Sequence, residues 1–202
     1  MSTMAFRPTP VTAWPAIAHG PSLRPAPGMI EPPPVIARLP VHTRPPAPPG
    51  PGTRPPRWWW VGCHGGAGCS TLARLIPGGW EAGRAWPRPE LGGPPGVLLV
   101  CRSHQHGLAA AAAAIRQWAA GLVSPAVSIW GLIIVADAPG RIPKPLAVWR
   151  SRLTGTVPAT VLVPWVDRWR VQPPTQDTAP NEIAQLGRIL QSPAWTARKE
   201  SP

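Results

Sequence analysis

Four short apolar runs recur along the chain after residue 57, and each has the length and continuity of a β-strand that is buried on both faces. They occupy residues 58–61, 97–101, 129–136 and 160–164. The spacing of apolar residues between and after these runs predicts helices. We place the helices over residues 70–76, 106–121, 145–153 and 181–191. Strands that alternate with helices in this way predict an α/β fold, with a small and mostly parallel sheet that helices cover.

Two local features refine this pattern. Residues 77–95 are rich in glycine and proline and contain no long apolar run, which predicts a surface connection. Asn181 stands directly before the apolar periodicity of the last helix, so we expect its side chain to cap that helix. The sequence therefore predicts four strands and four helices.

The N-terminal part has a different composition. Residues 1–57 contain 17 of the 33 prolines, and their single acidic residue is Glu31. Proline lacks the backbone N–H and fixes φ, so runs of proline exclude helix and interior strand. We therefore expect residues 1–56 to be a disordered Pro/Arg-rich arm, residues 57–192 to be the folded domain, and residues 193–202 to be a flexible tail.

The charge balance is strongly basic. The 20 Lys and Arg residues against 8 Asp and Glu residues give a net charge of +12. Such a balance favours anionic partners, for example nucleic acid or anionic lipid. GC-rich coding, which favours Arg, Pro, Ala and Gly over Lys, produces the same balance without a partner. The sequence leaves both explanations open.

Cysteine content and apolar segments indicate where the protein resides. The chain has 3 Cys, and its first 20 residues contain prolines where a secretory signal would be apolar. The longest apolar stretch, near residues 126–138, contains Ser128 and Asp137. It is shorter than the roughly 20 residues that a helix needs to cross a membrane. We therefore expect a cytoplasmic protein without a transmembrane segment.

A glycine-rich loop follows the first predicted strand. It reads Gly62-Cys63-His64-Gly65-Gly66-Ala67-Gly68-Cys69-Ser70-Thr71. Glycines let the chain curl so that successive backbone N–H groups point at one anion beside the start of a helix. The candidate nucleotide-binding residues are Gly65, Gly66, Ala67, Gly68, Cys69, Ser70 and Thr71. The Ser70 hydroxyl stands where it can reach a Mg²⁺ ion.

This loop resembles the deviant Walker A loop of the MinD/ParA family of P-loop ATPases, whose signature is Lys-Gly-Gly-x-Gly-Lys-[Ser/Thr]-Thr. The spacing is the same, but His64 and Cys69 stand in place of the two signature lysines. The family's second-motif aspartate, in an Asp-x-x-x-Gly segment, has no match. Residues 77–95 offer Glu81 and Glu90 without that pattern.

The resemblance implies ATP and Mg²⁺ as ligands. The chain is also similar to short proteins of actinobacterial plasmids and phages that share this loop and the segment 136–140, which implies a role in plasmid, mobile-element or chromosome maintenance. Phosphoryl transfer depends on positioning and charge neutralisation, and this chain lacks both the lysine and the metal-side aspartate. We therefore expect a nucleotide-binding pseudo-ATPase with a regulatory or adaptor role, and a purely structural loop is the alternative.

Residues near other strand ends are further candidates. Asp137 follows a buried strand, where ligands of open parallel sheets bind, so it could contact a base or ribose; it could equally be a turn residue before Pro139. Arg102 and Arg141 could supply the positive charge that the loop lacks. The cysteines and histidines at the strand ends do not have standard zinc spacing, and we interpret them as buried cysteines and loop histidines.

The segment from Trp165 to Arg170 alternates tryptophan with arginine. Such a segment could stack on bases or contact a protein, although a half-buried edge decorated with arginines is the simpler interpretation. Together with the basic arm it supports a second hypothesis. In that hypothesis the chain is a basic interaction protein that binds nucleic acid or a protein partner, and its loop is inert.

Overall fold

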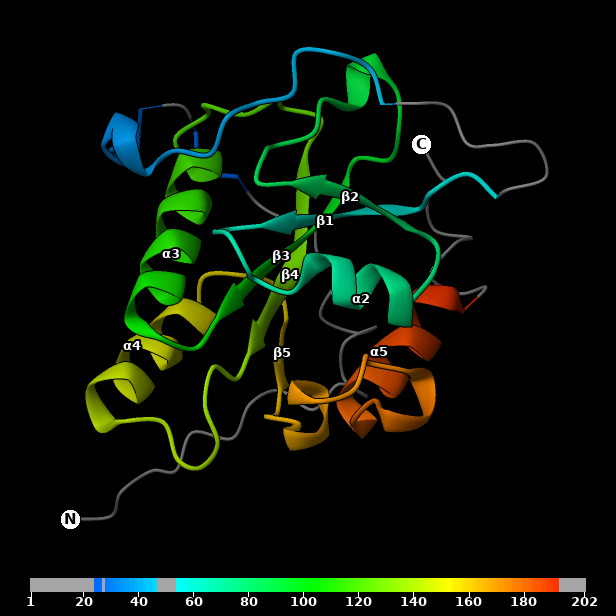
Figure 1. The fold of residues 1–202 in the computed structure, drawn as a ribbon. Helices are drawn as coiled ribbons and strands as arrows, with labels where there is room; N and C mark the ends of the chain where they lie inside the picture. The colour runs from blue at the N-terminus through cyan, green and yellow to red at the C-terminus, as the bar shows by residue number, and fades with distance from the viewer. Residues whose placement is uncertain (1–23, 27, 47–53, 193–202) are drawn as a thin grey trace.

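The fold is built on one sheet of five parallel strands (Figure 1). The computed structural model describes residues 24–26, 28–46 and 54–192. The strands are β1 (Trp58–Gly62), β2 (Gly79–Gly83), β3 (Gly96–Arg102), β4 (Ser128–Val135) and β5 (Thr160–Val163). Their order across the sheet is β2-β1-β3-β4-β5, and every neighbouring pair is parallel. The predicted α/β fold is therefore confirmed.

Helices cover both faces of this sheet. The α-helices are α2 (Cys69–Leu75), α3 (Gln105–Ala119), α4 (Lys144–Thr154) and α5 (Asn181–Gln191). The short 3₁₀ helices are η2 (Val35–Ala37), η3 (Pro89–Leu91), η4 (Asp167–Arg170) and η5 (Gln176–Thr178). Helices α3 and α4 pack on one face and α2 and α5 on the other, which gives three layers (Figure 1).

Burial on both faces explains the unusual sequence of β1. Trp58 and Trp60 point into the layer of α2 and α5, whereas Trp59 points into the layer of α3, because successive side chains of a strand alternate between faces. None of the three rings is more than 4% exposed. The prediction of a strand covered on both faces is confirmed here.

The segment 77–95 contains a strand that the sequence pattern did not predict. Residues Gly79–Gly83 form β2, an edge strand that pairs with β1. Trp86, in the same segment, is fully buried. The prediction of a surface connection was therefore wrong. The segment has two glycines and Glu81 where a strand usually has an apolar run. It is a strand because it pairs with β1, and its own sequence pattern does not predict one.

The N-terminal arm also differs from its prediction. Residues 28–46, here named the strap, run across α3 to the edge of β2 (Figure 1). The buried side chain of Gln117 in α3 accepts the N–H of Leu39 at 2.9 Å and donates to its carbonyl at 2.8 Å. Val41 forms an isolated bridge with Trp86. The predicted disorder therefore does not extend over the strap, because its backbone is hydrogen-bonded to a buried amide.

The last helix covers the predicted residues but begins differently. Its N-cap residue is Pro180, which takes the extended backbone geometry that precedes a helix, and no side chain caps it. Asn181 is already helical, so the predicted cap was wrong. The predicted tail, 193–202, and arm residues 1–23, 27 and 47–53 lie outside the described residues. No described helix is long and apolar enough to cross a membrane.

Candidate functional site

The glycine-rich loop lies at the carboxyl end of β1, where the order of the strands reverses. Strand β2 flanks β1 on one side, and β3, β4 and β5 follow on the other. In doubly wound sheets with this strand order, ligands bind in the crevice at the carboxyl ends of β1 and β3. The loop passes this crevice before it enters α2. The fold therefore places the loop at the position where such sheets bind ligands.

Two glycines shape the loop. Gly66 has a φ of 72° and Gly68 a φ of 109°, in the left-handed region where other residues are strained. An added Cβ would meet nothing within 4 Å at Gly66 and only a Val135 methyl at 3.8 Å at Gly68. Backbone conformation, and not lack of space, therefore requires glycine at both positions.

The loop borders an open cavity of about 370 Å³. Every predicted residue from Gly65 to Thr71 lines this cavity, together with Glu81 and Arg84 from the β2 side and Arg102 from the end of β3. We name this space the loop cavity. Ser70 is exposed to it, as the prediction of a magnesium ligand requires. The structure thus brings the predicted loop residues together around one space.

Cys69 provides no charge at the position of the second signature lysine. Its Sγ lies beneath the loop, 3.3 Å from where a Cβ on Gly62 would stand. Burial, and then the negative charge of Glu81, raise the pKa of Cys69 to about 12. The thiol is therefore protonated and neutral at physiological pH.

His64, at the position of the first signature lysine, points inward and is 4% exposed. Its Nε2 accepts the backbone N–H of Arg102 at 3.0 Å, and its Nδ1 lies 2.7 Å from the carbonyl oxygen of Gly65. This pair of contacts fits the neutral ring with its proton on Nδ1. Burial is the largest cause that lowers the pKa of His64. His64 therefore ties the loop to the end of β3.

Arg102 brings a positive charge to the loop from the neighbouring strand. Its Nε donates to the carbonyl of Gly66 at 3.1 Å, and its Nη1 donates to the carbonyl of Ala136 at 2.9 Å. These bonds use two of the five guanidinium N–H donors. The side chain is thereby fixed in the cavity wall, as the prediction that it replaces the lysine charge requires.

Sequence comparison places this loop within a family. Residues 57–186 match the sequence model of DUF6668, described as a family of unknown function. The chain belongs to this family. The DUF6668 region begins just before β1 and ends within α5, so it contains the loop and all five strands. No curated protein and no solved structure matches the chain.

Asp137 does not line the loop cavity of this DUF6668 protein. It borders a second hollow of about 800 Å³ at the carboxyl ends of β4 and β5, which Arg141, Arg150 and Trp165 also line. Its carboxylate accepts a short hydrogen bond from the hydroxyl of Ser103, which in turn accepts the N–H of Asp137. Asp137 therefore fastens the end of β4 to the end of β3, and any ligand contact would be made in the second hollow.

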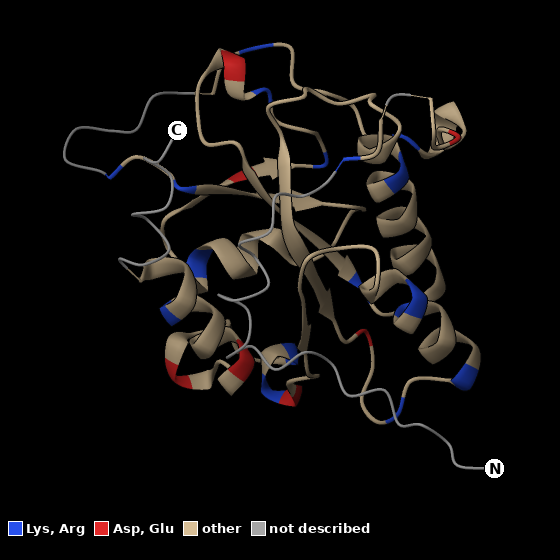
Figure 2. Cartoon of the chain, turned by 180° about the vertical axis from the view of Figure 1, so that it is seen from behind, with Lys and Arg blue, Asp and Glu red and all other residues tan. Residues whose placement is uncertain are grey.

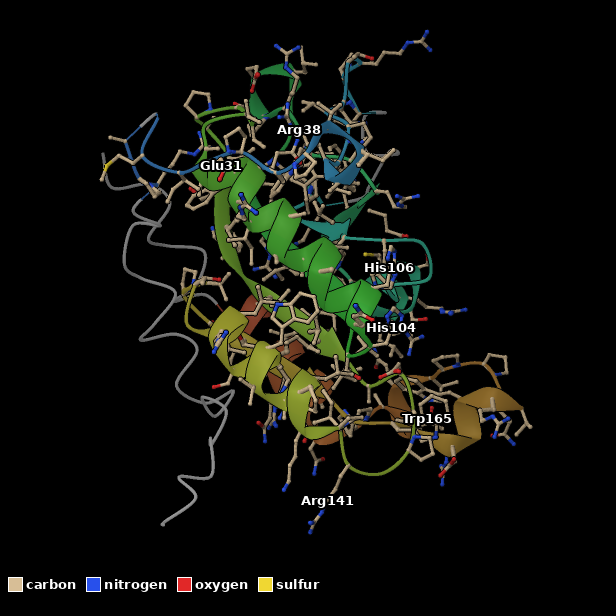
Figure 3. All side chains as sticks on the ribbon, turned by 90° about the vertical axis from the view of Figure 1, so that its left-hand side faces the viewer. Glu31, Arg38, His104, His106, Arg141 and Trp165 are labelled. Carbon is tan, nitrogen blue, oxygen red and sulfur yellow. The ribbon has the colours of Figure 1, made fainter. Side chains whose placement is uncertain are left out.

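Arg141, another predicted residue, points away from the loop. Figure 3 shows Arg141 extending outward, far from His104 and His106 at the start of α3. Arg141 therefore does not replace the missing lysine in this arrangement, since it lines only the second hollow among the cavities described.

The segment from Trp165 to Arg170 is partly used for internal packing. The indole N–H of Trp169 donates to Thr178 at 3.0 Å, and its ring packs against the core between the sheet and α5. Arg168 and Arg170 are exposed. Figure 2 shows basic residues spread over several helices and loops, not gathered on this segment. These features agree with a half-buried edge that carries arginines.

The described cysteines and histidines have structural roles. Within the described ranges, no group of three or more His, Cys, Asp or Glu side chains is arranged to hold a metal ion. The three cysteines are free and buried. His104 instead caps α3, because its Nδ1 accepts the N–H of Gly107 at 2.9 Å.

Glu81 is a cavity residue that sequence reasoning passed over. It lies on β2 beside the loop, is exposed, and makes no ion pair with another described residue. Its segment is rich in glycine and proline, which predicted a surface connection, so the sequence did not predict that the carboxylate lies beside the loop. Its position, two residues beyond the glycine that pairs with Trp58, is a signal only once β2 is known.

Proposed function

We propose that this DUF6668 protein binds the phosphate groups of a nucleotide, ATP in the first instance, in the loop cavity. In this proposal it is a MinD/ParA-like pseudo-ATPase with a regulatory or adaptor role. The observation that carries the proposal is the open cavity that the whole glycine loop lines at the ligand crevice of the sheet, with Arg102 in its wall. Loop N–H groups and a guanidinium are suitable donors to phosphate oxygens.

The second hollow supplies room for the rest of the nucleotide. Arg102 contacts the loop at Gly66 and the end of β4 at Ala136, and Ala136 lines the second hollow. Phosphates in the loop cavity would therefore leave the ribose and base on the far side of Arg102. There, Asp137 offers a carboxylate for hydroxyl groups and Trp165 offers an aromatic ring.

The donor set of the loop cavity also fits a magnesium ion. Mg²⁺ prefers hard oxygen ligands and is bound through one or two carboxylates together with substrate phosphates. The exposed hydroxyl of Ser70 and the exposed carboxylate of Glu81 line the same cavity. A nucleotide-bound Mg²⁺ would take ligands from these two groups and would neutralise phosphate charge.

Hydrolysis is not part of the proposal. Lys144, the single lysine in the part of the chain that the structure describes, lies at the start of α4 and does not line the loop cavity. Cys69 is neutral, and Arg102 is tied to two carbonyl groups. The cavity therefore has donors to bind an anion, with Arg84 and Arg102 in its wall, but neither of the two loop positions that correspond to the signature lysines supplies a cation to the β–γ bridge.

Titration of the full chain with the fluorescent analogue mant-ATP, with Mg²⁺ present, tests the proposal. Wild type should bind saturably, and Gly68→Val should abolish binding because it distorts the loop. Gly121→Val is a matched control, because Gly121 also has a positive φ, of 79°, with open space around it at the end of α3. Absence of binding by wild type, or equal binding by a folded Gly68→Val variant, would contradict the proposal.

The second hypothesis gains less support. The partly buried ring of Trp169 packs against the core, and the basic residues are spread over the surface. Arg168 and Arg170 are exposed and could contact a partner. Fluorescence anisotropy with a labelled single strand separates the two hypotheses. Tight, salt-dependent binding of the strand without nucleotide binding would make the basic interaction protein the better account. The free, buried cysteines fit the cytoplasmic setting that either hypothesis assumes.

A further inference from the structure

His64 ties the glycine-rich loop to β3 through both nitrogen atoms of its ring. Nε2 accepts the N–H of Arg102 at 3.0 Å, so it carries no proton. Nδ1 therefore carries the proton and donates to the carbonyl of Gly65 at 2.7 Å. Only the neutral ring in this tautomer makes both hydrogen bonds at once. The ring is 4% exposed, so water offers little replacement for either bond.

Positively charged or protonatable groups surround this ring. His104 and His106, at the start of α3, lie with their ring centroids 5.2 and 5.6 Å from that of His64. Arg102 approaches from the end of β3. Burial lowers the pKa of His64 most, and the charges of His104, His106 and Arg102 lower it further, against the hydrogen bond to its backbone neighbour.

Within the part of the chain that the structure describes, no acidic side chain is bonded to His64. Cys63 precedes His64, and burial raises the pKa of its thiol well above the ordinary value, so it stays neutral. Glu81 lines the same cavity, but within the described residues it makes no hydrogen bond or ion pair with His64. A second proton on His64 would therefore have no counter-charge.

We propose that His64 is a proton-operated latch, which holds the loop against β3 when neutral and releases it when protonated. A proton on Nε2 would face the N–H of Arg102, donor against donor, so that hydrogen bond would be lost. The guanidinium of Arg102 is bonded to Gly66 in the loop and to Ala136 outside it, so a loop released from β3 moves away from a guanidinium that Ala136 still holds. The effect of His64 protonation on the shape of the loop is independent of the proposed nucleotide. Its effect on nucleotide affinity rests on the proposed function.

The backbone amide of Arg102 reports directly on the latch. Hydrogen exchange of the full chain, followed by NMR and corrected for intrinsic rates, should show its protection falling roughly tenfold for each pH unit below the midpoint of His64. Two-bond ¹H–¹⁵N spectra should show His64 gaining its second proton over the same range. Amides within β3, from Leu98 to Val100, should keep their protection, because the sheet itself does not titrate.

Two variants complete the test. His64→Gln keeps an acceptor for the Arg102 N–H but cannot titrate, so protection of that amide should no longer depend on pH. His106→Gln removes one neighbouring imidazole and leaves the latch, so the pH-dependent loss should persist.

Three results would overturn the proposal. The first is an Arg102 amide that stays protected in wild type after His64 has gained its second proton. The second is a loss shared equally by the β3 amides, which would indicate global unfolding. The third is the same pH-dependent loss in folded His64→Gln. If that variant does not fold, the joint titration of His64 and the Arg102 amide in wild type decides. A working latch with no nucleotide binding would overturn the proposed function alone.

Discussion

At the residue scale, tryptophan rings of the sheet pack where a neighbouring strand has no side chain. A Cβ on Gly79 would stand 2.2 Å from Nε1 of Trp58, and a Cβ on Gly96 would stand 2.1 Å from the ring of Trp130. Neither glycine has a positive φ. The rings therefore require these glycines, in strand positions where glycine is ordinarily unfavourable.

Substitution of Gly96 by alanine should therefore destabilise the fold. The added methyl would collide with Trp130, and such overpacking costs about 1–3 kcal/mol. Urea denaturation should show a lower midpoint for Gly96→Ala. Gly65→Ala is the control, because an added Cβ there meets nothing within 4 Å and the backbone φ is not positive. Equal destabilisation of both variants would contradict the packing argument.

The buried imidazole of His64 also makes stability depend on pH. Its folded pKa lies below the ordinary value of 6.5, so the unfolded chain binds a proton first as pH falls. The contribution of the neutral ring is therefore fully present above pH 6.5 and is lost as pH falls through the folded pKa. Denaturation of wild type should show this loss setting in as pH falls through 6.5, and His64→Gln should show a smaller one. Parallel pH profiles for the two proteins would be the contrary result.

At the element scale, the strap and β2 depend on each other and on α3. Gln117 binds both backbone groups of Leu39 and accepts the indole N–H of Trp86 at 3.1 Å. His42 of the strap lies 3.0 Å, through Nε2, from the carbonyl oxygen of Ala82 in β2. One buried amide thus joins a proline-rich segment to the end of an edge strand, and Figure 3 shows the strap residues Glu31 and Arg38 at the opposite end of α3 from His104.

Trypsin offers a sharp test of the strap. Every arginine before residue 57 precedes a proline, which trypsin does not cleave, except Arg38, and this segment has no lysine. Gln117→Ala leaves buried strap groups without partners, at about 1–3 kcal/mol each. Cleavage after Arg38 should therefore be at least about tenfold faster than in wild type, as mass spectrometry would measure.

Arg116→Gln is the control for this test. Arg116 donates to the backbone carbonyl of Glu31 at 3.1 Å and approaches its carboxylate at 4.0 Å. Both contacts lie on the exposed surface, where water can replace them, so they contribute little. Its cleavage rate should stay near that of wild type. Rapid cleavage of wild type itself would mean that the strap is open in solution, as the sequence alone had suggested.

The sequence predicted those elements whose structure follows from their own local pattern of apolar residues and glycines. The short apolar runs of β1, β3, β4 and β5, bounded by turn residues, favour a buried strand, and the loop is recognisable because its glycine spacing is local. Strand β2 and the strap were not predictable, because Gly79, Glu81 and the prolines gain their structure only from partners distant in sequence. The inward turn of His64 was hidden for the same reason, since its acceptor role needs the Arg102 N–H from another strand.

At the scale of the whole molecule, the candidate site is assembled from several strand ends. The loop after β1 supplies glycines and Ser70, β2 supplies Glu81, and Arg102 at the end of β3 joins the loop to the end of β4. Cys69 is the position where this assembly departs most from the loop that it resembles. In this account, binding of an anion therefore depends on groups from the ends of several strands that are distant in sequence.

Cys69→Lys should strengthen ATP binding if the loop cavity accepts phosphate. A charge-assisted contact is worth about 1.5–3 kcal/mol, which corresponds to roughly ten- to hundred-fold in affinity. Cys69→Ala, which adds no charge, should leave affinity near that of wild type. Wild type should show no Mg²⁺-dependent ATP turnover above background, because a neutral thiol cannot stabilise the transferred phosphoryl group. Robust wild-type turnover would show that other groups catalyse hydrolysis.

The most direct test of the central claim locates the nucleotide on the protein. In an ¹H–¹⁵N NMR titration of the full chain with ATP and Mg²⁺, the amides from Gly65 to Thr71 and that of Arg102 should shift together and saturate. Amides at the end of α3, near Gly121, should not move. Saturable shifts confined to the loop and the adjacent strand ends are the result that the account predicts. Absence of saturable shifts at the loop, or shifts only at a distant surface, would contradict it.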